Sequence, residues 1–320
     1  MLEFQASDSG DLQASIVLES WRSARDASGP YASRRNEESS GEVNVILLRP
    51  DREAAEAPTS RELESVRYLI DNDKAISEAL LTAVWNEYPS IRGWLSTCMP
   101  EEDVAEIAPP ANNLDDIRRL VGVGNVFVLP TRAGELPYLG FELGCSWDTE
   151  HGLGVVMRGS EPVEIGGADV SFNQHTPDVD RILRNLTRLI LGLGISARYK
   201  LSRRQALSKY APWVTRAQPD LGIYNDDGGL VLAIDVTDFH WEGPSRWWIN
   251  FIEYRDESEM FVRMTINPSR PEIFCWKRTS RTTKDWSPTG EARGITAVCQ
   301  VDEIGAILPL ASIYSAVDVG

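Results

Sequence analysis

Two carboxylates and a histidine lie together in the middle of the chain, at Asp148, Glu150 and His151. Side chains of these types exchange protons, or bind a metal ion, when they converge on one point. The same residues are also typical of a turn between strands, in which the aspartate accepts backbone hydrogen bonds and a following glycine adopts a positive φ. A metal would need ligands from elsewhere, and the chain has only two further histidines. We therefore expect a structural turn without a metal, and keep the three residues as catalytic candidates.

A second pair of carboxylates, Asp220 and Asp235, flanks a strong hairpin signal at residues 225–229. Metal-dependent nucleases use a hairpin with a carboxylate on each strand and a lysine two residues after the second carboxylate, which together bind the metal and position water. Thr237 stands where that lysine would be. Because the pattern lacks one of its chemical groups, a metal-dependent hydrolase or a degenerate nuclease-like domain remains an alternative function.

Aromatic residues are concentrated in the second half of the chain, where six of the ten tryptophans follow residue 200. Trp247 and Trp248 are adjacent, so they would face opposite sides of a strand. Exposed aromatic rings can form a platform for a small ligand or a peptide, and these two residues are candidate binding residues for such a module. Ordinary packing within a sheet is the other explanation, because aromatic side chains are common in strands.

The net negative charge of the protein comes entirely from its first half. Residues 1–175 contain 30 acidic and 14 basic residues, whereas residues 176–320 contain 18 of each. This excess disfavours nucleic acid as a partner of the first half, because phosphates would be repelled. It favours a basic protein partner, which would be steered toward the acidic surface. Acidity that only keeps the protein in solution is the alternative explanation.

Six acidic residues near the middle of the first half are the candidate binding residues for such a partner. We expect four of them to precede a short helix that starts at Asn113, and two to lie in its first turn, where carboxylates are favourable. The six are Glu101, Glu102, Asp103, Glu106, Asp115 and Asp116.

An unusual block of sequence runs from Gly140 to Met157 and reads GFELGCSWDTEHGLGVVM, with VEIGGAD following at 163–169. Here the chain resembles an uncharacterised bacterial domain family with the pattern G-F-x-x-G-C-x-W-D-x-E-H-G-x-G-V. The two predicted helices before the block, ending near Tyr88-Pro89, are also similar to that family, and the resemblance covers roughly residues 11–175. Members look like accessory or immunity proteins beside secreted toxins. The resemblance thus implies a protein that masks a toxin-like partner.

Hydrophobic periodicity and end signals predict both helices and strands. In the first half, strands are expected at 12–18 and 43–48, and a capping-box spacing at Thr59 and Glu62 begins a helix. Asp73 is expected to cap the next helix, and a glycine-punctuated β meander fills 125–165.

In the second half, Thr176 is expected to cap a helix, and the spacing of Ser202 and Gln205 predicts another. Strands follow, and residues 304–316 are expected to close the chain as a helix. We therefore expect an α+β protein of two domains, 1–175 and 176–320, with mostly antiparallel sheets and a few packing helices. The second domain would be mainly β and rich in tryptophan.

The chain lacks signals for export, membrane insertion and common cofactors. Its N-terminus has neither the basic start nor the apolar stretch of a secretory signal. The longest apolar run, 189–195, is too short to span a bilayer. The four cysteines form no C-x-x-C pair and fit buried thiols in a reducing compartment. We expect a cytoplasmic, non-enzymatic binding or immunity-type protein without a cofactor.

Overall fold

The computed structural model describes most of the chain and divides it into two compact units. Unit 1 comprises Met1–Pro177 with Gln205–Val214, and unit 2 comprises Asp178–Arg204 with Thr215–Gly320. Helices and mostly antiparallel sheets occur in both, which confirms the expected α+β class. The described residues are 2–7, 11–26, 37–49, 57–194, 200–203, 207–208, 219–227, 230–236, 262–278 and 286–317.

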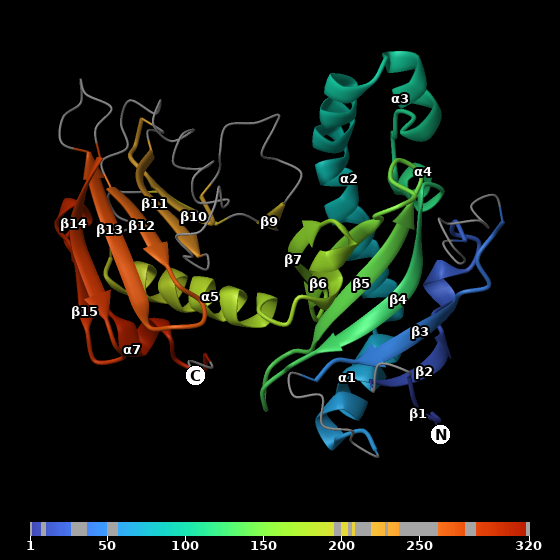
Figure 1. The fold of residues 1–320 in the computed structure, drawn as a ribbon, viewed down its shortest axis with the longest axis horizontal. Coiled ribbons are helices and arrows are strands. Elements are labelled where there is room, and N and C mark those ends of the chain that lie inside the picture. The colour runs from blue at the N-terminus through green and yellow to red at the C-terminus, as the bar shows by residue number, and fades with distance from the viewer. Residues whose placement is uncertain are drawn as a thin grey trace. The chain divides into compact units, whose positions relative to one another are not determined.

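Unit 1 is built on an eight-stranded sheet (Figure 1). Neighbouring strands are antiparallel, except that β3 pairs with β4, and β7 with β9, in parallel. The strands, in their order across the sheet, are β1 (Gln5–Ala6), β2 (Leu12–Val17), β3 (Glu42–Leu47), β4 (Val121–Leu129), β5 (Tyr138–Cys145), β6 (Leu153–Arg158), β7 (Glu161–Gly166) and β9 (Leu207–Ser208).

Four helices form the crossover between the parallel strands β3 and β4. They are α1 (Ser60–Asp71), α2 (Asp73–Cys98), α3 (Glu101–Ile107) and α4 (Leu114–Arg118). Thr59 and Glu62 make the expected capping box at the start of α1, so two backbone amides there are satisfied. The Asn113 side chain accepts from the amide of Asp116 and begins α4 as expected.

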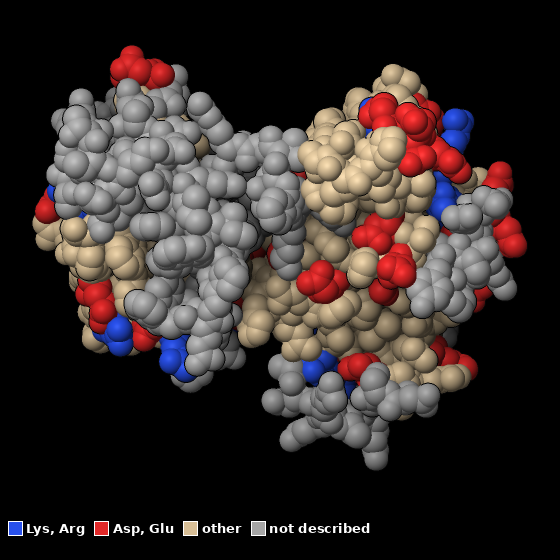
Figure 2. All heavy atoms as spheres, turned by 45° about the horizontal axis from the view of Figure 1, so that its top comes forward, with Lys and Arg blue, Asp and Glu red and all other residues tan. Residues whose placement is uncertain are grey.

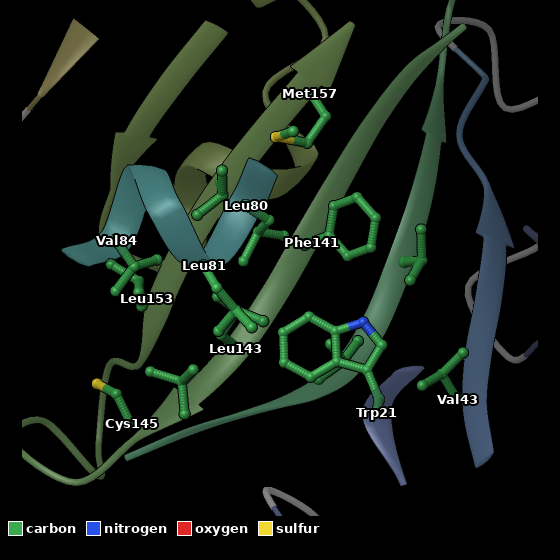
Figure 3. Close-up of a cluster of buried hydrophobic side chains, with 14 of the residues drawn as sticks. Trp21, Val43, Leu80, Leu81, Val84, Phe141, Leu143, Cys145, Leu153 and Met157 are labelled. Atoms are coloured by element: carbon green, nitrogen blue, oxygen red, sulfur yellow. The ribbon is translucent and has the colours of Figure 1, made fainter. Parts of the chain in front are cut away.

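The long helix α2 provides the side chains that fill the core of unit 1. Figure 3 shows Leu80, Leu81 and Val84 of α2 directed toward Phe141 and Leu143 of the sheet, with Trp21 beside them. All of these side chains are fully buried or nearly so. The buried residues of α2 recur every three or four positions, as on the apolar face of an amphipathic helix. Burial of these apolar side chains is the main contribution to the stability of unit 1.

Two glycines of the unusual block allow the backbone of a short 3-10 helix, η3 (Ala168–Phe172), to lie directly on the sheet. A Cβ at Gly140 would lie 1.6 Å from the carbonyl oxygen of Ser171, and one at Gly154 would lie 2.4 Å from that of Gly167. No side chain fits at such distances. The glycines of β5 and β6 are therefore positions of close backbone approach.

Unit 2 contains the helix α5 (Thr176–Gly192), which begins just before it, and a six-stranded sheet in the order β14-β13-β12-β11-β10-β8. Neighbouring strands are antiparallel except β11 and β12, which are parallel. Figure 1 shows α5 running along this sheet. The strands are β8 (Lys200–Arg203), β10 (Leu221–Tyr224), β11 (Leu230–Val236), β12 (Val262–Ile266), β13 (Glu272–Arg278) and β14 (Trp286–Arg293).

The end of the chain forms a hairpin rather than the closing helix expected at 304–316. β15 (Val298–Val301) and β16 (Ala306–Pro309) pair across η6 (Asp302–Ile304) and Gly305, whose φ is +65°, and only α7 (Leu310–Ile313) is helical after them. Burial alternates along β16, so the apolar residues fit a strand period of two.

The helix start predicted at Ser202 is wrong, whereas the helices expected at Asp73 and Thr176 are present with a different residue at the capping position. Ser202 lies in β8, paired with β10, and does not cap a helix. Asp73 is the first residue of α2 and accepts from the amide of Ser20, while Asn72 is the capping residue. Thr176 is the first residue of α5 and not its cap, and its hydroxyl donates to Glu164 at 2.6 Å.

Among the described residues, no helix combines the length and the apolar character that crossing a bilayer would require.

Replacing Gly140 with alanine should disrupt the contact between β5 and η3. Because the new Cβ would overlap the Ser171 carbonyl, we expect the free energy of unfolding to fall by about 3 kcal/mol or more, the upper end of overpacking costs. Hydrogen exchange of the peptides covering 138–172 should become faster. Gly124→Ala in β4 is the control, because its Cβ would meet its nearest neighbour at 3.7 Å. Equal effects of the two substitutions would contradict this explanation.

Candidate functional site

Asp148, Glu150 and His151 lie in the turn between β5 and β6. One carboxylate oxygen of Asp148 accepts from the amide of His151 at 2.9 Å and lies 3.2 Å from Nδ1 of the same residue. The carbonyl of Asp148 accepts from the amide of Gly152, which has a φ of +66°, and from the Cys145 thiol at 3.4 Å. The side chain and the carbonyl of Asp148 thus each accept a backbone hydrogen bond that closes the turn.

The three candidate side chains of the turn are neither enclosed nor joined by further groups of the described residues, as a catalytic site would require. The His151 side chain is 77% exposed, Asp148 is 24% exposed, and Glu150 is an exposed residue. No group of three or more His, Cys, Asp or Glu side chains suited to a metal occurs in the part of the chain that the structure describes. The geometry accounts for Asp148 and His151 as turn residues.

The neighbouring tryptophan of the block connects this turn to α2. The ring of Trp147 packs against that of Tyr88 with centroids 5.4 Å apart. The Tyr88 hydroxyl donates to the carbonyl of Pro109 at 2.7 Å, and burial raises the pKa of Tyr88 to about 12. The phenol therefore stays protonated and keeps this hydrogen bond at physiological pH.

Arg92 on α2 holds both ends of α3. Its Nη2 donates to the Glu101 carboxylate at 2.7 Å, and its Nε donates to the carbonyl of Ala108 at 2.9 Å. Val104 and Ala108 are fully buried beneath the helix. Sequence reasoning missed both this residue and α3 itself, because only the fold brings α2 alongside residues 101–108.

The six acidic candidate residues therefore lie on two short helices at one end of unit 1. Glu101, Glu102, Asp103 and Glu106 precede α4 as expected, but they form a helix of their own, α3, which the sequence analysis did not predict. Asp115 and Asp116 lie in the first turn of α4, as expected. Figure 2 shows acidic groups gathered over this end of unit 1.

Two of the six carboxylates have structural partners. Glu101 pairs with Arg92 and also accepts from Ser96. Asp116 accepts from the amide of Asn112 and lies 3.7 Å from Arg119. The other four, Glu102, Asp103, Glu106 and Asp115, are exposed and form no ion pair with any side chain in the described ranges. We call these four residues the acidic surface.

Asp220 and Asp235 adjoin the paired residues Leu221 and Ile234 of β10 and β11, so they are neighbours across these two strands of unit 2. Asp220 precedes β10 and accepts from the amide of Val236 at 2.9 Å, and both aspartates are 3% exposed. Thr265 of β12 is paired with Asp235. The other expected residues of this half, Thr237, Trp247 and Trp248, lie outside the described residues.

A pair of cysteines in unit 2 also comes together only in the fold. The sulfur atoms of Cys275 in β13 and Cys299 in β15 are 3.3 Å apart and buried. No pattern in the sequence predicted this contact, because the two cysteines are far apart in the chain.

Residues 14–172 match the profile of a protein family described as a domain of unknown function, DUF6985. The match extends from β2 to η3. It includes the unusual block, the helices α1 to α4 before it and all six acidic residues. The expected resemblance to an uncharacterised domain family is thus confirmed for this part of the chain. A search among curated proteins finds no match.

The hydrogen bonds of this turn predict that replacing Asp148 costs more stability than replacing His151. Asp148→Ala should lower the free energy of unfolding by about 1 kcal/mol, because a backbone hydrogen bond is lost. His151→Ala should change it by less than about 0.5 kcal/mol, because the ring is mostly exposed. Urea unfolding measures both, and Asp148→Asn, which keeps an acceptor oxygen, is the control. A cost for His151→Ala equal to that for Asp148→Ala would contradict the turn assignment.

The cysteines should differ sharply in reactivity. Burial raises the pKa of the Cys145 thiol to about 12, and the thiolate is the reactive form. At pH 8, iodoacetamide should therefore modify the exposed Cys98 and leave Cys145 unmodified until the protein is unfolded. Mass spectrometry of digested protein gives the rate at each site, with Cys98→Ser as the control. Equally fast modification of Cys145 in the folded chain would contradict its burial.

Proposed function

We propose that unit 1 binds and masks a basic protein, such as a toxin, through the acidic surface, and that it does so inside the cell as an immunity or accessory-type protein. The observation that carries this proposal is the position of Glu106. It is exposed in the last turn of α3, where no basic residue accompanies it. A carboxylate at a helix C-terminus opposes the helix dipole, so helix stability does not explain it.

The charges on α3 also repel one another. Glu102 and Glu106 are four residues apart, so their side chains lie on the same helical face, where like charges are destabilising. The first-turn residues Glu102 and Asp103 are individually favourable there, but the full set of carboxylates is not. The positive charges of a basic partner would attract these carboxylates and offset their mutual repulsion.

The acidic surface is held on a rigid support. Arg92 fixes both ends of α3, Tyr88 fixes the segment that follows, and Val104 anchors the helix in the core. A surface whose charges are already in position loses less conformational entropy when a partner binds. This supports a role in recognition.

The overall charge supports the same role. The net excess of 16 negative charges lies in residues 1–175, which would raise the rate of encounter with a basic protein. A protein that binds phosphates, such as a toxin nuclease, is basic for that reason and is a suitable partner.

The test is the double substitution Glu102→Lys with Glu106→Lys in the full chain. A partner captured from the host by the wild-type protein should associate with the variant at least about tenfold more slowly at low salt, and the difference should shrink as salt screens the charges. Association kinetics across ionic strength measure this.

The matched control is Glu64→Lys with Asp71→Lys on α1, which changes the charge equally at exposed positions away from α3 (Figure 1). We expect this control to bind much as the wild type does. A partner lost equally by both variants would mean that only net charge matters. A partner retained by the α3 variant at low salt would refute the proposed surface.

A further inference from the structure

Three polar side chains of unit 2 lie next to one another on one face of its sheet. Leu221 pairs with Ile234, so Asp220 comes beside Asp235 at the end of β10 and β11. Asp235 pairs directly with Thr265 of β12. Directly paired residues of neighbouring strands point to the same face. Asp220, Asp235 and Thr265 therefore form a row across three strands.

This row is buried, which is unusual for such groups. Asp220 and Asp235 are each 3% exposed, and Thr265 is 0% exposed. Two aspartates rarely occupy neighbouring buried positions in a sheet, because their charges repel and each loses its hydration. A divalent cation offsets both charges at once.

Thr265 gives an independent indication of a ligand. Its hydroxyl is fully buried and has no hydrogen-bond partner within the described part of the chain. Buried hydroxyl groups almost always have a partner, and an orphan beside two carboxylates is explained by a ligand that the hydroxyl would contact.

The position of the row in the fold is that of a binding site. Asp235 and Thr265 are each the second-to-last residue of a parallel strand, β11 and β12. In sheets with parallel strands, ligands bind just outside the carboxyl ends of those strands. The same end of the sheet carries Asp220.

We propose that Asp220, Asp235 and Thr265 hold a divalent cation of the Mg²⁺ type. This ion binds hard oxygen ligands, needs only one or two carboxylates, and completes its shell with water. Within the described ranges, no three His, Cys, Asp or Glu side chains converge, which disfavours a zinc site or an all-protein calcium cage. The site lies in unit 2 and is independent of the acidic surface.

The test is calorimetric titration of the metal-free full chain with MnCl₂, followed by competition with MgCl₂. Mn²⁺ substitutes for Mg²⁺ at oxygen sites and can also be followed by electron paramagnetic resonance. The wild type should bind about one Mn²⁺ that Mg²⁺ displaces, as a site with two carboxylates implies. Asp220→Asn and Asp235→Asn should each weaken binding about tenfold or more.

Thr265→Val distinguishes a ligand site from a structural role. Valine has nearly the shape of threonine, so the variant should fold and be at least as stable as the wild type without metal. It should nevertheless bind Mn²⁺ several times more weakly. This variant keeps the test decisive if an aspartate variant fails to fold.

Two controls separate this site from other carboxylates. Glu291→Gln removes an exposed charge from β14 of the same sheet, and Glu102→Lys with Glu106→Lys removes charge from the acidic surface. Both should bind Mn²⁺ as the wild type does. The absence of saturable Mn²⁺ binding, or unchanged binding by the Asp235 and Thr265 variants, would overturn the proposal.

Discussion

The structure of unit 1 depends on the packing of one helix, α2, against its sheet. The buried side of α2 extends from Ile76 through Leu80 and Val84 to Leu95, along nearly its whole length. This packing places α1 at one end of the helix and α3 at the other, and it closes the crossover between the parallel strands β3 and β4. Without it, the sheet would expose its apolar face to water.

The same helix joins the unusual sequence block to the acidic surface. Trp147 of the block packs on Tyr88, and Tyr88 and Arg92 hold the segment around α3 through its backbone carbonyls and Glu101. The hydrogen-bonded turn begins at Asp148, the residue that follows Trp147. The block thus contacts the helix that carries the support of the acidic surface, and two of its polar side chains, Asp148 and His151, are bonded within the turn.

Unit 2 contrasts with unit 1 in where its polar groups lie. In unit 1, the carboxylates proposed to function are exposed, and their effect would act over a distance through the electric field. In unit 2, Asp220 and Asp235 are buried in the sheet beside Thr265, where the proposed cation would be held by direct contact. The two proposals therefore differ in kind, one resting on long-range attraction and the other on direct contact, although both units are α+β.

The sequence by itself determined the local features whose causes are local. The capping box of Thr59, the cap at Asn113, the positive φ of Gly152 and the strands at 221–224 and 230–236 follow from nearby residues alone. The α+β class followed from the mixture of helical and strand periods.

Only the tertiary structure decided features that distant residues stabilise. The α2 helix continues through Pro89 because Tyr88, Ile91 and Leu95 are buried on either side of it, which outweighs the local cost of proline. Residues 101–107 form a helix because Arg92 and a buried Val104 hold them, and residues 306–309 form a strand because β15 lies beside them. Likewise, the row of Asp220, Asp235 and Thr265 exists only through strand register, since pairing between strands brings together groups that no sequence spacing connects.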